Sequence, residues 1–222
     1  MKKILITIDG PAASGKGRIA KYIAKKYQFL HIDSGLLYRK LASLFINSNI
    51  NLKNVSDIKK LLLKKPNLSL RNNKYLRNEK VGKVTSKIAK ISFVRNYVNK
   101  QQILHTKIKT SKKGFVIDGR DIGSVVFKKA DLKLYIEVES NVRAKRRHKQ
   151  LIDLGEKSIY ARILKEIKLR DRQDRIRTNS PLVIPKGAII IDNSKSFNDT
   201  LNKINQIIGK LYNGKNWTKK AD

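Results

Sequence analysis

One glycine-rich segment, between an apolar strand and an amphipathic helix, restricts the fold of this chain more than any other feature. Residues Gly10-Pro-Ala-Ala-Ser-Gly15-Lys16 fit the pattern G-x-x-x-x-G-K directly after the apolar run Ile4–Ile8. In the segment that follows, Ile19 and Ile23 share one side at helical spacing. Glycines let a backbone fold around a phosphate, its N–H groups and the helix N-terminus attract the anion, and the lysine reaches the β- and γ-phosphates. The alternative is a plain glycine-rich turn with a surface lysine, which the flanking strand and helix disfavour.

The residues after this lysine lack a hydroxyl group for magnesium. The usual phosphate-binding loop (P-loop) continues with Ser or Thr, whereas here Gly17 and Arg18 follow Lys16. Any Mg²⁺ must therefore be held by the nucleotide and water, with help from a carboxylate elsewhere. Asp118 is the first candidate, acting through water, because it ends an apolar strand that would lie beside the loop, and Asp33 is a second candidate. Either carboxylate can instead simply cap a turn or a helix.

Apolar runs that alternate with helical patterns predict an α/β fold. Short uninterrupted apolar segments are typical of parallel strands buried on both faces. The sequence contains five short segments that are largely apolar, at 4–8, 29–32, 115–121 (a strand and then a turn), 132–138 and 188–191. With helices between them, they predict a five-stranded parallel sheet covered on both sides.

The connection from 36 to 110 is far longer than one crossover needs, so we expect it to contain a separate lobe. Residues 36–46 have helical spacing, and Ser56-Asp57 is a good start for a further helix, which ends before Pro66. We expect a small hairpin over 67–76 and then a long helical region from about Glu79 to about Ile108.

The composition excludes several classes of protein. The chain has no cysteine, so disulfide frameworks and thiolate metal sites are impossible, and its three histidines are scattered. No apolar run is long enough to cross a membrane, and the opening Met-Lys-Lys before ILITIDG is too short and too quickly acidic for a signal peptide. We therefore expect a cytoplasmic protein with no membrane partner.

The charge of the chain is strongly unbalanced, with 51 Lys and Arg against 17 Asp and Glu, a net charge of +34. A surface this basic can bind nucleic acid irrespective of sequence. The excess is nevertheless spread along the whole chain, as A+T-rich codons would produce, and no basic strand studded with aromatic residues accompanies it. We expect no specific nucleic-acid partner, although such a surface would still steer anionic nucleotides inward.

Arginines form a second set of candidate residues. Arg120 lies in a tight turn after a buried strand, at the edge where α/β proteins bind ligands. Arg170, Asp174 and Arg177 are spaced to share one face of a helix, although an exposed helix laced with salt bridges shows the same pattern. Several guanidinium groups that converge can grip one phosphate through bidentate contacts.

A third basic stretch, residues 142–150, opens a helix for which Asn141 is the predicted cap, and Ser158 is the predicted cap of the next helix. The stretch can be a solvated face. In a phosphoryl-transfer enzyme it can equally belong to a mobile lid, about 142–160, whose arginines cover the transferring group and exclude water. Such catalysis is mostly positioning and charge stabilisation.

Five segments together resemble bacterial cytidylate kinases, a family of nucleoside monophosphate (NMP) kinases. The segments are ITIDGPAASGKG, DSGLLYR, FVIDGRDIGSVVF, RAKRR and EIKLRDRQDRIR followed by PL, in the order and approximate spacing of that family. The resemblance spans nearly the whole chain. The pair DSG-x-x-YR and DGRD-x-G-x-V-F is specific within these kinases, and GKG is usual in them.

The resemblance implies a monomer that transfers the γ-phosphate of ATP to CMP or dCMP. It also implies a P-loop kinase core, residues 1–36 and 109–222 with the lid, and an NMP-binding region with a shortened insert over 37–108. The insert's sheet would be cut to a single hairpin.

Residue roles follow from the same resemblance. ATP, with Mg²⁺, would be held by Gly10, Pro11, Ala12, Ala13, Ser14, Gly15, Lys16, Gly17 and Arg18. CMP would be bound by Ser34, Arg39, Ser86, Arg95, Gly119, Arg120, Asp121, Arg170, Asp174 and Arg177. The catalytic residues would be Lys16, Arg120, Arg143, Arg146 and Arg147.

Within the CMP set, Arg39 and Arg120 would grip the acceptor phosphate. Cytosine would lie among Ser86, Arg95, Asp121 and Arg177, and Arg170 and Asp174 would reach the sugar side. Cytosine presents an amino donor at N4 beside acceptors at N3 and O2, so Ser or Asp acceptors with an Arg donor can read it.

Arg18 departs from the family pattern, because Thr or Ser usually stands there and one hydroxyl contact to the ATP phosphates is lost. Two other functions stay open at this stage. One is another small-molecule or NMP kinase, acting for example on UMP or AMP, in which Ser86 and Arg95 would not read a base. A more remote alternative is a basic nucleic-acid-binding protein with a degenerate P-loop.

Overall fold

The sheet of this protein is parallel throughout, with β1 at its centre. The computed structural model describes residues 3–71, 74–153 and 155–214. The strands are β1 (Ile4–Asp9), β2 (Phe29–Asp33), β3 (Gly114–Gly119), β4 (Leu132–Glu137) and β5 (Ile189–Asp192). They lie in the order β2-β3-β1-β4-β5. The predicted five-stranded parallel sheet is confirmed.

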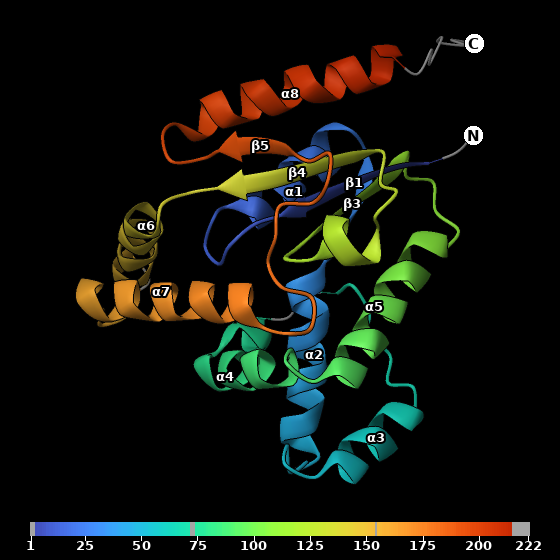
Figure 1. Ribbon diagram of the computed structural model, residues 1–222, viewed down its shortest axis with the longest axis vertical. Helices are drawn as coiled ribbons and strands as arrows, with labels where there is room; N and C mark the ends of the chain where they lie inside the picture. Colours follow the sequence, from blue (N-terminus) through green and yellow to red (C-terminus); the bar gives the residue numbers. More distant parts are fainter. Residues whose placement is uncertain (1–2, 72–73, 154, 215–222) are drawn as a thin grey trace.

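Helices cover both faces of the sheet, and β3 shows how side chains alternate between them. Val116 packs in the same cluster as Ile19 of α1 (Lys16–Lys26) and Ile204 of α8 (Phe197–Gly214). Phe115 and Ile117, one residue to each side, pack instead with α2 (Ser34–Asn47) and α5 (Ser92–Lys107). In Figure 1, α8 runs along one side of the sheet and α2 extends away from the other.

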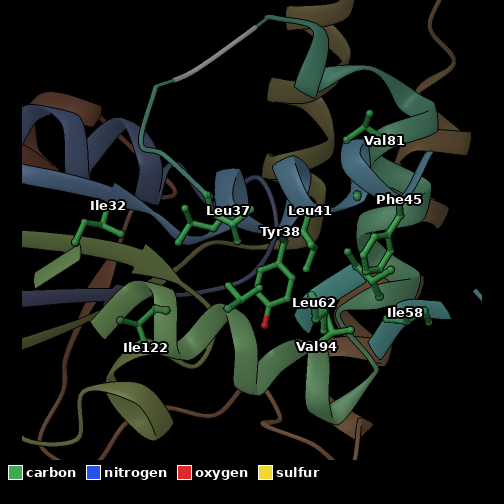
Figure 2. Packing of buried hydrophobic residues seen from close by; sticks show 14 of the residues in the cluster. Ile32, Leu37, Tyr38, Leu41, Phe45, Ile58, Leu62, Val81, Val94 and Ile122 are labelled. Atoms are coloured by element: carbon green, nitrogen blue, oxygen red, sulfur yellow. The ribbon is translucent and has the colours of Figure 1, made fainter. Parts of the chain in front are cut away.

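Residues 34–107 form a helical lobe that shares its core with the sheet. Besides α2 and α5 it contains α3 (Val55–Leu63), η1 (Lys74–Arg77) and α4 (Glu79–Ile88). Figure 2 shows one cluster reaching from Ile32 and Ile122 beside the sheet to Phe45 and Ile58 at the far end of the lobe. This continuous packing fixes the lobe against the strand ends where the predicted site residues lie.

The helical region predicted from about Glu79 to about Ile108 consists of two helices, because the chain breaks between α4 and α5. Ile91, just before α5, has extended backbone with φ −83° and ψ 117°. The break leaves the carbonyl of Ala89 without a helical N–H, and Nη1 of Arg95 donates to it at 3.0 Å. The helix predicted from Ser56-Asp57 is present but begins one residue earlier, at Val55, because Asn54 caps it and accepts from the backbone N–H groups of Ser56 and Asp57.

The predicted hairpin over 67–76 is wrong for the described residues on its two sides. Its turn, Asn72-Asn73, lies outside the described part of the chain. No strand occurs over 67–71, and 74–77 is a 3₁₀ helix. Side chains of α5 contact backbone carbonyls in and next to this segment: Tyr97 Oη donates to Pro66 O and His105 Nε2 lies 2.8 Å from Leu68 O.

The two helices of the basic region are α6 (Ser140–Asp153) and α7 (Tyr160–Ile176), and they pack against each other through Ala144, Ile163 and Ile167. Both predicted caps are wrong. Asn141 lies inside α6, and Ser158 hydrogen-bonds Nδ1 of His148 at 2.8 Å instead of capping α7. Over residues 3–71, 74–153 and 155–214, every helix is too short or too polar to span a bilayer.

Candidate active site

A buried asparagine, Asn193, hydrogen-bonds the backbone of the P-loop between β1 and α1. Gly15 has φ +86°, and a Cβ there would lie 2.6 Å from Nδ2 of Asn193. This Nδ2 donates to the Ser14 carbonyl at 2.9 Å, and Oδ1 of Asn193 accepts from Thr200 Oγ1 at 3.0 Å. Asn193 follows the last residue of β5 and was missed from the sequence, where only its place at a strand end marks it.

Two cations of the site have lowered pKa values because they are partly buried beside other cations. Burial first, and the charge of Arg120 second, lower the pKa of Lys16 to about 8. For Arg170 the charge of Arg120 comes first and burial second, and together they lower its pKa to about 10. Cations held this close favour a polyvalent anion between them.

A cavity of about 590 Å³ joins the P-loop to the lobe and to α7. It is lined by most residues predicted for the site: Ala12, Ala13, Ser14, Gly15, Lys16, Gly17, Arg18, Asp33, Ser34, Arg39, Ser86, Arg95, Asp118, Gly119, Arg120, Asp121, Arg146, Arg147, Arg170, Asp174 and Arg177. Gly10, Pro11 and Arg143 are not among its lining residues. The P-loop and the predicted acceptor residues therefore face one shared space.

Aspartates orient the arginines at the middle of this cavity. Nε of Arg120 donates to the carboxylate of Asp174, which also accepts from Nη1 of Arg177 at 3.4 Å. Arg39 donates from Nη1 to the Leu76 carbonyl at 2.9 Å. Asp174 thus links α7 to the turn after β3, so these guanidinium groups are held in place before any ligand binds.

At the lobe end of the cavity lies a buried ion pair between Arg95 and Asp121, which are 3% and 5% exposed. Five buried polar atoms of cavity-lining residues have no hydrogen-bond partner within the described part of the chain: Ser14 Oγ in the P-loop, and Tyr38 Oη, Thr85 Oγ1, Arg95 Nε and Arg177 Nη2. Buried polar atoms left unpaired are costly. The pocket therefore suits a polar ligand such as a nucleobase.

Sequence reasoning named Ser86 for this pocket and missed Tyr38 and Thr85. The hydroxyl of Ser86 donates back to the Gly82 carbonyl at 3.2 Å, while that of its neighbour Thr85 is buried. Tyr38 lies within the DSGLLYR segment, and Thr85 adjoins Ser86, so only position along the chain could have pointed to them.

The two candidate carboxylates for a metal differ in what they contact. Oδ1 of Asp118 lies 2.6 Å from Nε2 of His31, and its Oδ2 lies 3.6 Å from where a Cβ on Gly17 would be. Asp33 accepts from the Leu36 N–H at 2.9 Å and so caps α2. No group of three His, Cys, Asp or Glu side chains gathers over 3–71, 74–153 and 155–214. A metal here would rely mainly on phosphate and water.

The three arginines of α6 lie in different surroundings. Arg143 is buried and bonds the Val138 and Ala12 carbonyls at 2.9 and 3.0 Å and the carboxylate of Asp171. Arg146 donates to the carbonyl of Asn193 at 2.7 Å, and Arg147 to Gln150 at 3.0 Å. Arg143 therefore joins the P-loop to α7, while Arg146 and Arg147 line the cavity.

Arg18, which stands where a hydroxyl is usual, stacks on an aromatic ring of α8. Its Cζ lies 3.7 Å from the ring centroid of Phe197, a close cation–π contact. Arg18 is exposed and also lines the cavity. The stack draws its guanidinium toward α8, and Phe197 could not have been predicted as its partner from the sequence.

The family model and the similar proteins agree on one family. Residues 6–210 match the family model described as cytidylate kinase. The cytidylate kinase of Rickettsia rickettsii is 43% identical over 190 residues, which cover 86% of this chain and 84% of that protein. The cytidylate kinase of Rickettsia akari is 41% identical over 194 residues, covering 87% and 86%.

Among solved structures, TT1252 from Thermus thermophilus is similar in fold. It superimposes with a TM-score of 0.55 at 13% sequence identity, over 95% of this chain and 99% of that chain. At this identity the likeness supports the architecture alone.

Proposed function

Because this chain belongs to the cytidylate kinase family, we propose that it transfers the γ-phosphate of ATP to CMP or dCMP, forming ADP with CDP or dCDP. One observation of the structure supports this activity most directly. A single cavity has a P-loop lysine at one end, a buried polar pocket around Arg95 and Asp121 at the other, and arginines between them. These are the parts needed to bind two nucleotides with their phosphates facing.

No side chain has to act as a nucleophile in this reaction. An oxygen of the acceptor phosphate forms a bond to the γ-phosphorus while the bond from that phosphorus to the β,γ-bridging oxygen breaks, and ADP leaves. Lys16 and Arg120 would neutralise the charge on the transferring group, with Arg146 and Arg147 contributing if the lid closes. Catalysis would come from positioning and fixed positive charge.

The pocket around Arg95 and Asp121 would read the base. Arg95 donates and Asp121 accepts, which matches the acceptors at N3 and O2 and the amino group at N4 of cytosine. Uracil carries a carbonyl at that amino position, so an acceptor of the pocket would face another acceptor and be left unpaired. Ser86 and Arg177 would complete the pocket.

We propose that the divalent metal of the reaction is Mg²⁺. The loop lacks the usual hydroxyl, so a carboxylate would help to hold the metal through water. Asp118 would hold a metal-bound water, which is supported by the position of its Oδ2 beside Gly17, whereas Asp33 Oδ1 caps α2. When bound with ATP, Mg²⁺ neutralises part of the phosphate charge.

Three further proposals rest on the family resemblance. They are the division into a kinase core (1–36 and 109–222) and an NMP-binding region (37–108), a lid at about 142–160, and action as a cytoplasmic monomer. Arg143, which ties the P-loop to Asp171, keeps its proposed lid role only if closure releases that pair.

A coupled assay with Mg·ATP and CMP, dCMP, UMP or AMP tests the function. We expect turnover with CMP and dCMP and little with the other two, because only cytosine satisfies the pocket around Arg95. Activity confined to UMP or AMP would leave a kinase but remove the cytosine assignment. Tight RNA binding at physiological salt, insensitive to CMP and without phosphoryl transfer, would favour the nucleic-acid-binding alternative.

Replacing Arg18 by threonine should lower the KM for ATP by roughly two- to tenfold, the worth of one hydrogen bond. The change restores a hydroxyl at the first turn of α1 and removes a guanidinium that Phe197 holds toward α8. The KM for CMP should stay unchanged. Steady-state kinetics with varied ATP measure both constants.

Phe197→Leu is the matched control for this change, because it frees Arg18 from the ring without adding a hydroxyl. This variant should not lower the KM for ATP. If Arg18→Thr raises that KM instead, the arginine itself contacts the phosphates and compensates for the lost hydroxyl.

A further inference from the structure

Asp9 is the last residue of β1, directly before the P-loop. Its side chain nevertheless hydrogen-bonds the turn after β3, which is distant in sequence. Its side chain is fully buried, and its two oxygens accept from the backbone N–H groups of Ile122 at 2.8 Å and Gly123 at 2.7 Å. In the register of β1 and β3, Asp9 is opposite Gly119. Its carboxylate therefore reaches just beyond the end of β3.

The segment that Asp9 holds carries two residues of the cavity, Arg120 and Asp121. It continues into η2 (Ile122–Val126), a single turn of π-helix whose own N-cap, Asp121, makes no side-chain capping bond. Asp121 is engaged with Arg95 instead. The first N–H groups of η2 are thus satisfied by a carboxylate from another strand.

Both oxygens of Asp9 accept most strongly when the group is ionised. Burial raises its pKa to about 6, while the two backbone N–H bonds act in the opposite direction. At neutral pH the carboxylate form therefore prevails, and it can receive both bonds. An asparagine in its place would turn an NH₂ group toward one of the two N–H donors.

The turn is closely packed in this position. A Cβ on Gly123 would lie 2.7 Å from Thr7 Oγ1 and 3.1 Å from Oδ2 of Asp9. A Cβ on Gly119 would lie 2.5 Å from Cγ1 of Ile122. The backbone therefore rests directly on β1, and Asp9 fixes its distance from that strand.

We propose that Asp9 is a positioning residue that fixes the 119–123 turn, and with it Arg120 and Asp121, relative to the P-loop. Gly10, the first residue of the P-loop, directly follows Asp9 in the chain. One residue thus sets donor and acceptor sites at a fixed separation, which transfer between two bound nucleotides requires. The proposal rests on the proposed function, because it takes Arg120 as a ligand of the acceptor phosphate.

Asp9→Asn tests this role in the full-length protein. We expect kcat/KM for CMP to fall roughly 10- to 100-fold, as for loss of a hydrogen bond to a charged group, through both a higher KM for CMP and a lower kcat. The KM for ATP should stay within about twofold of wild type, because the Asp9 carboxylate bonds the acceptor turn and not the loop. The melting temperature is measured alongside.

Thr7→Val is the matched control. Thr7 lies two residues earlier on the same strand, is equally buried, and its hydroxyl has no hydrogen-bond partner within the described part of the chain. The replacement is nearly isosteric and removes no bond to the turn. All kinetic constants should stay within about twofold of wild type.

Gly123→Ala disturbs the same contact from the other side. We expect the same kinetic pattern as for Asp9→Asn: a lower kcat/KM for CMP and an almost unchanged KM for ATP. In the double variant with Asp9→Asn, the loss should be smaller than the product of the single losses, because both changes break one contact. If Asp9→Asn does not fold, Gly123→Ala against Thr7→Val decides the question.

Three outcomes separate the possibilities. Asp9→Asn with a lower melting temperature but wild-type kinetics would make Asp9 merely structural and overturn the proposal. An equal rise in the KM for ATP and CMP would also overturn it, since the P-loop itself would then have moved. A wild-type protein that phosphorylates no nucleotide would instead defeat the proposed function.

Discussion

Replacing Lys16 by methionine is expected to lower kcat for CMP phosphorylation by roughly 10²- to 10³-fold, as for loss of one preorganised charge from a transition state. Lys16 lines the cavity, and Nζ donates to the Pro11 carbonyl at 2.9 Å, which holds the side chain over the loop. Methionine keeps a long apolar chain but removes the charge. Kinetics with Mg·ATP and CMP give kcat and both KM values.

The stability of the Lys16→Met variant separates a catalytic loss from misfolding. Burial lowers the pKa of Lys16 to about 8, below its value of 10.5 in the unfolded chain, so its charged form disfavours folding at neutral pH. Removing the charge should therefore keep or raise the melting temperature.

Lys25→Met is the control for Lys16→Met, since Lys25 lies exposed in the last turn of the same helix and outside the cavity lining. It should leave kcat unchanged. If Lys16→Met retained most of the wild-type kcat, Lys16 would have no part in stabilising the transferring phosphate.

Replacing Arg95 by methionine is expected to reduce both stability and base selectivity. The change leaves the Asp121 carboxylate buried without its cation, and loss of one partner of such a pair lowers the free energy of unfolding by about 3–5 kcal/mol. It also removes the donor proposed to read cytosine. The ratio of kcat/KM for CMP to that for UMP should fall by about tenfold or more. Urea unfolding and paired kinetic assays measure the two effects.

A double variant tells these two effects of Arg95 apart. Adding Asp121→Asn to Arg95→Met removes the unpaired charge, so much of the lost stability should return. Selectivity for cytosine should not return with it, because neither reading group is restored. Recovery of selectivity together with stability would mean that Arg95 supports the fold alone. Unchanged selectivity in Arg95→Met would favour another kinase of the same fold.

Most of the sheet could be predicted because a buried parallel strand is a local pattern. The segments that form β1, β2, β3 and β4 are largely apolar, and their boundaries differ from the prediction by at most a few residues. The same local rules failed where tertiary contacts took over. Over 67–71 no strand forms, and side chains of α5 contact the carbonyls of Pro66 and Leu68 instead.

The candidate site divides in the same way. Lys16 and Arg120 could be identified from the sequence, because their residue types and their positions within motifs indicate their chemistry. Asp9, Asn193 and Phe197 were missed, because each acts on a segment distant in sequence: the turn after β3, the P-loop and Arg18. Pairings across such distances leave no periodic or motif signal in a single sequence.

The sequence by itself determined the P-loop, the parallel sheet and the family, since these depend on residue types at short, regular spacings. Only the tertiary structure decided which groups meet. Parallel register brings the Asp9 carboxylate to the N–H groups of Ile122 and Gly123, and burial makes that contact specific. A buried polar group must find a partner wherever the fold places one. Arg18 follows the same logic at the surface, where its partner is a ring on the last helix.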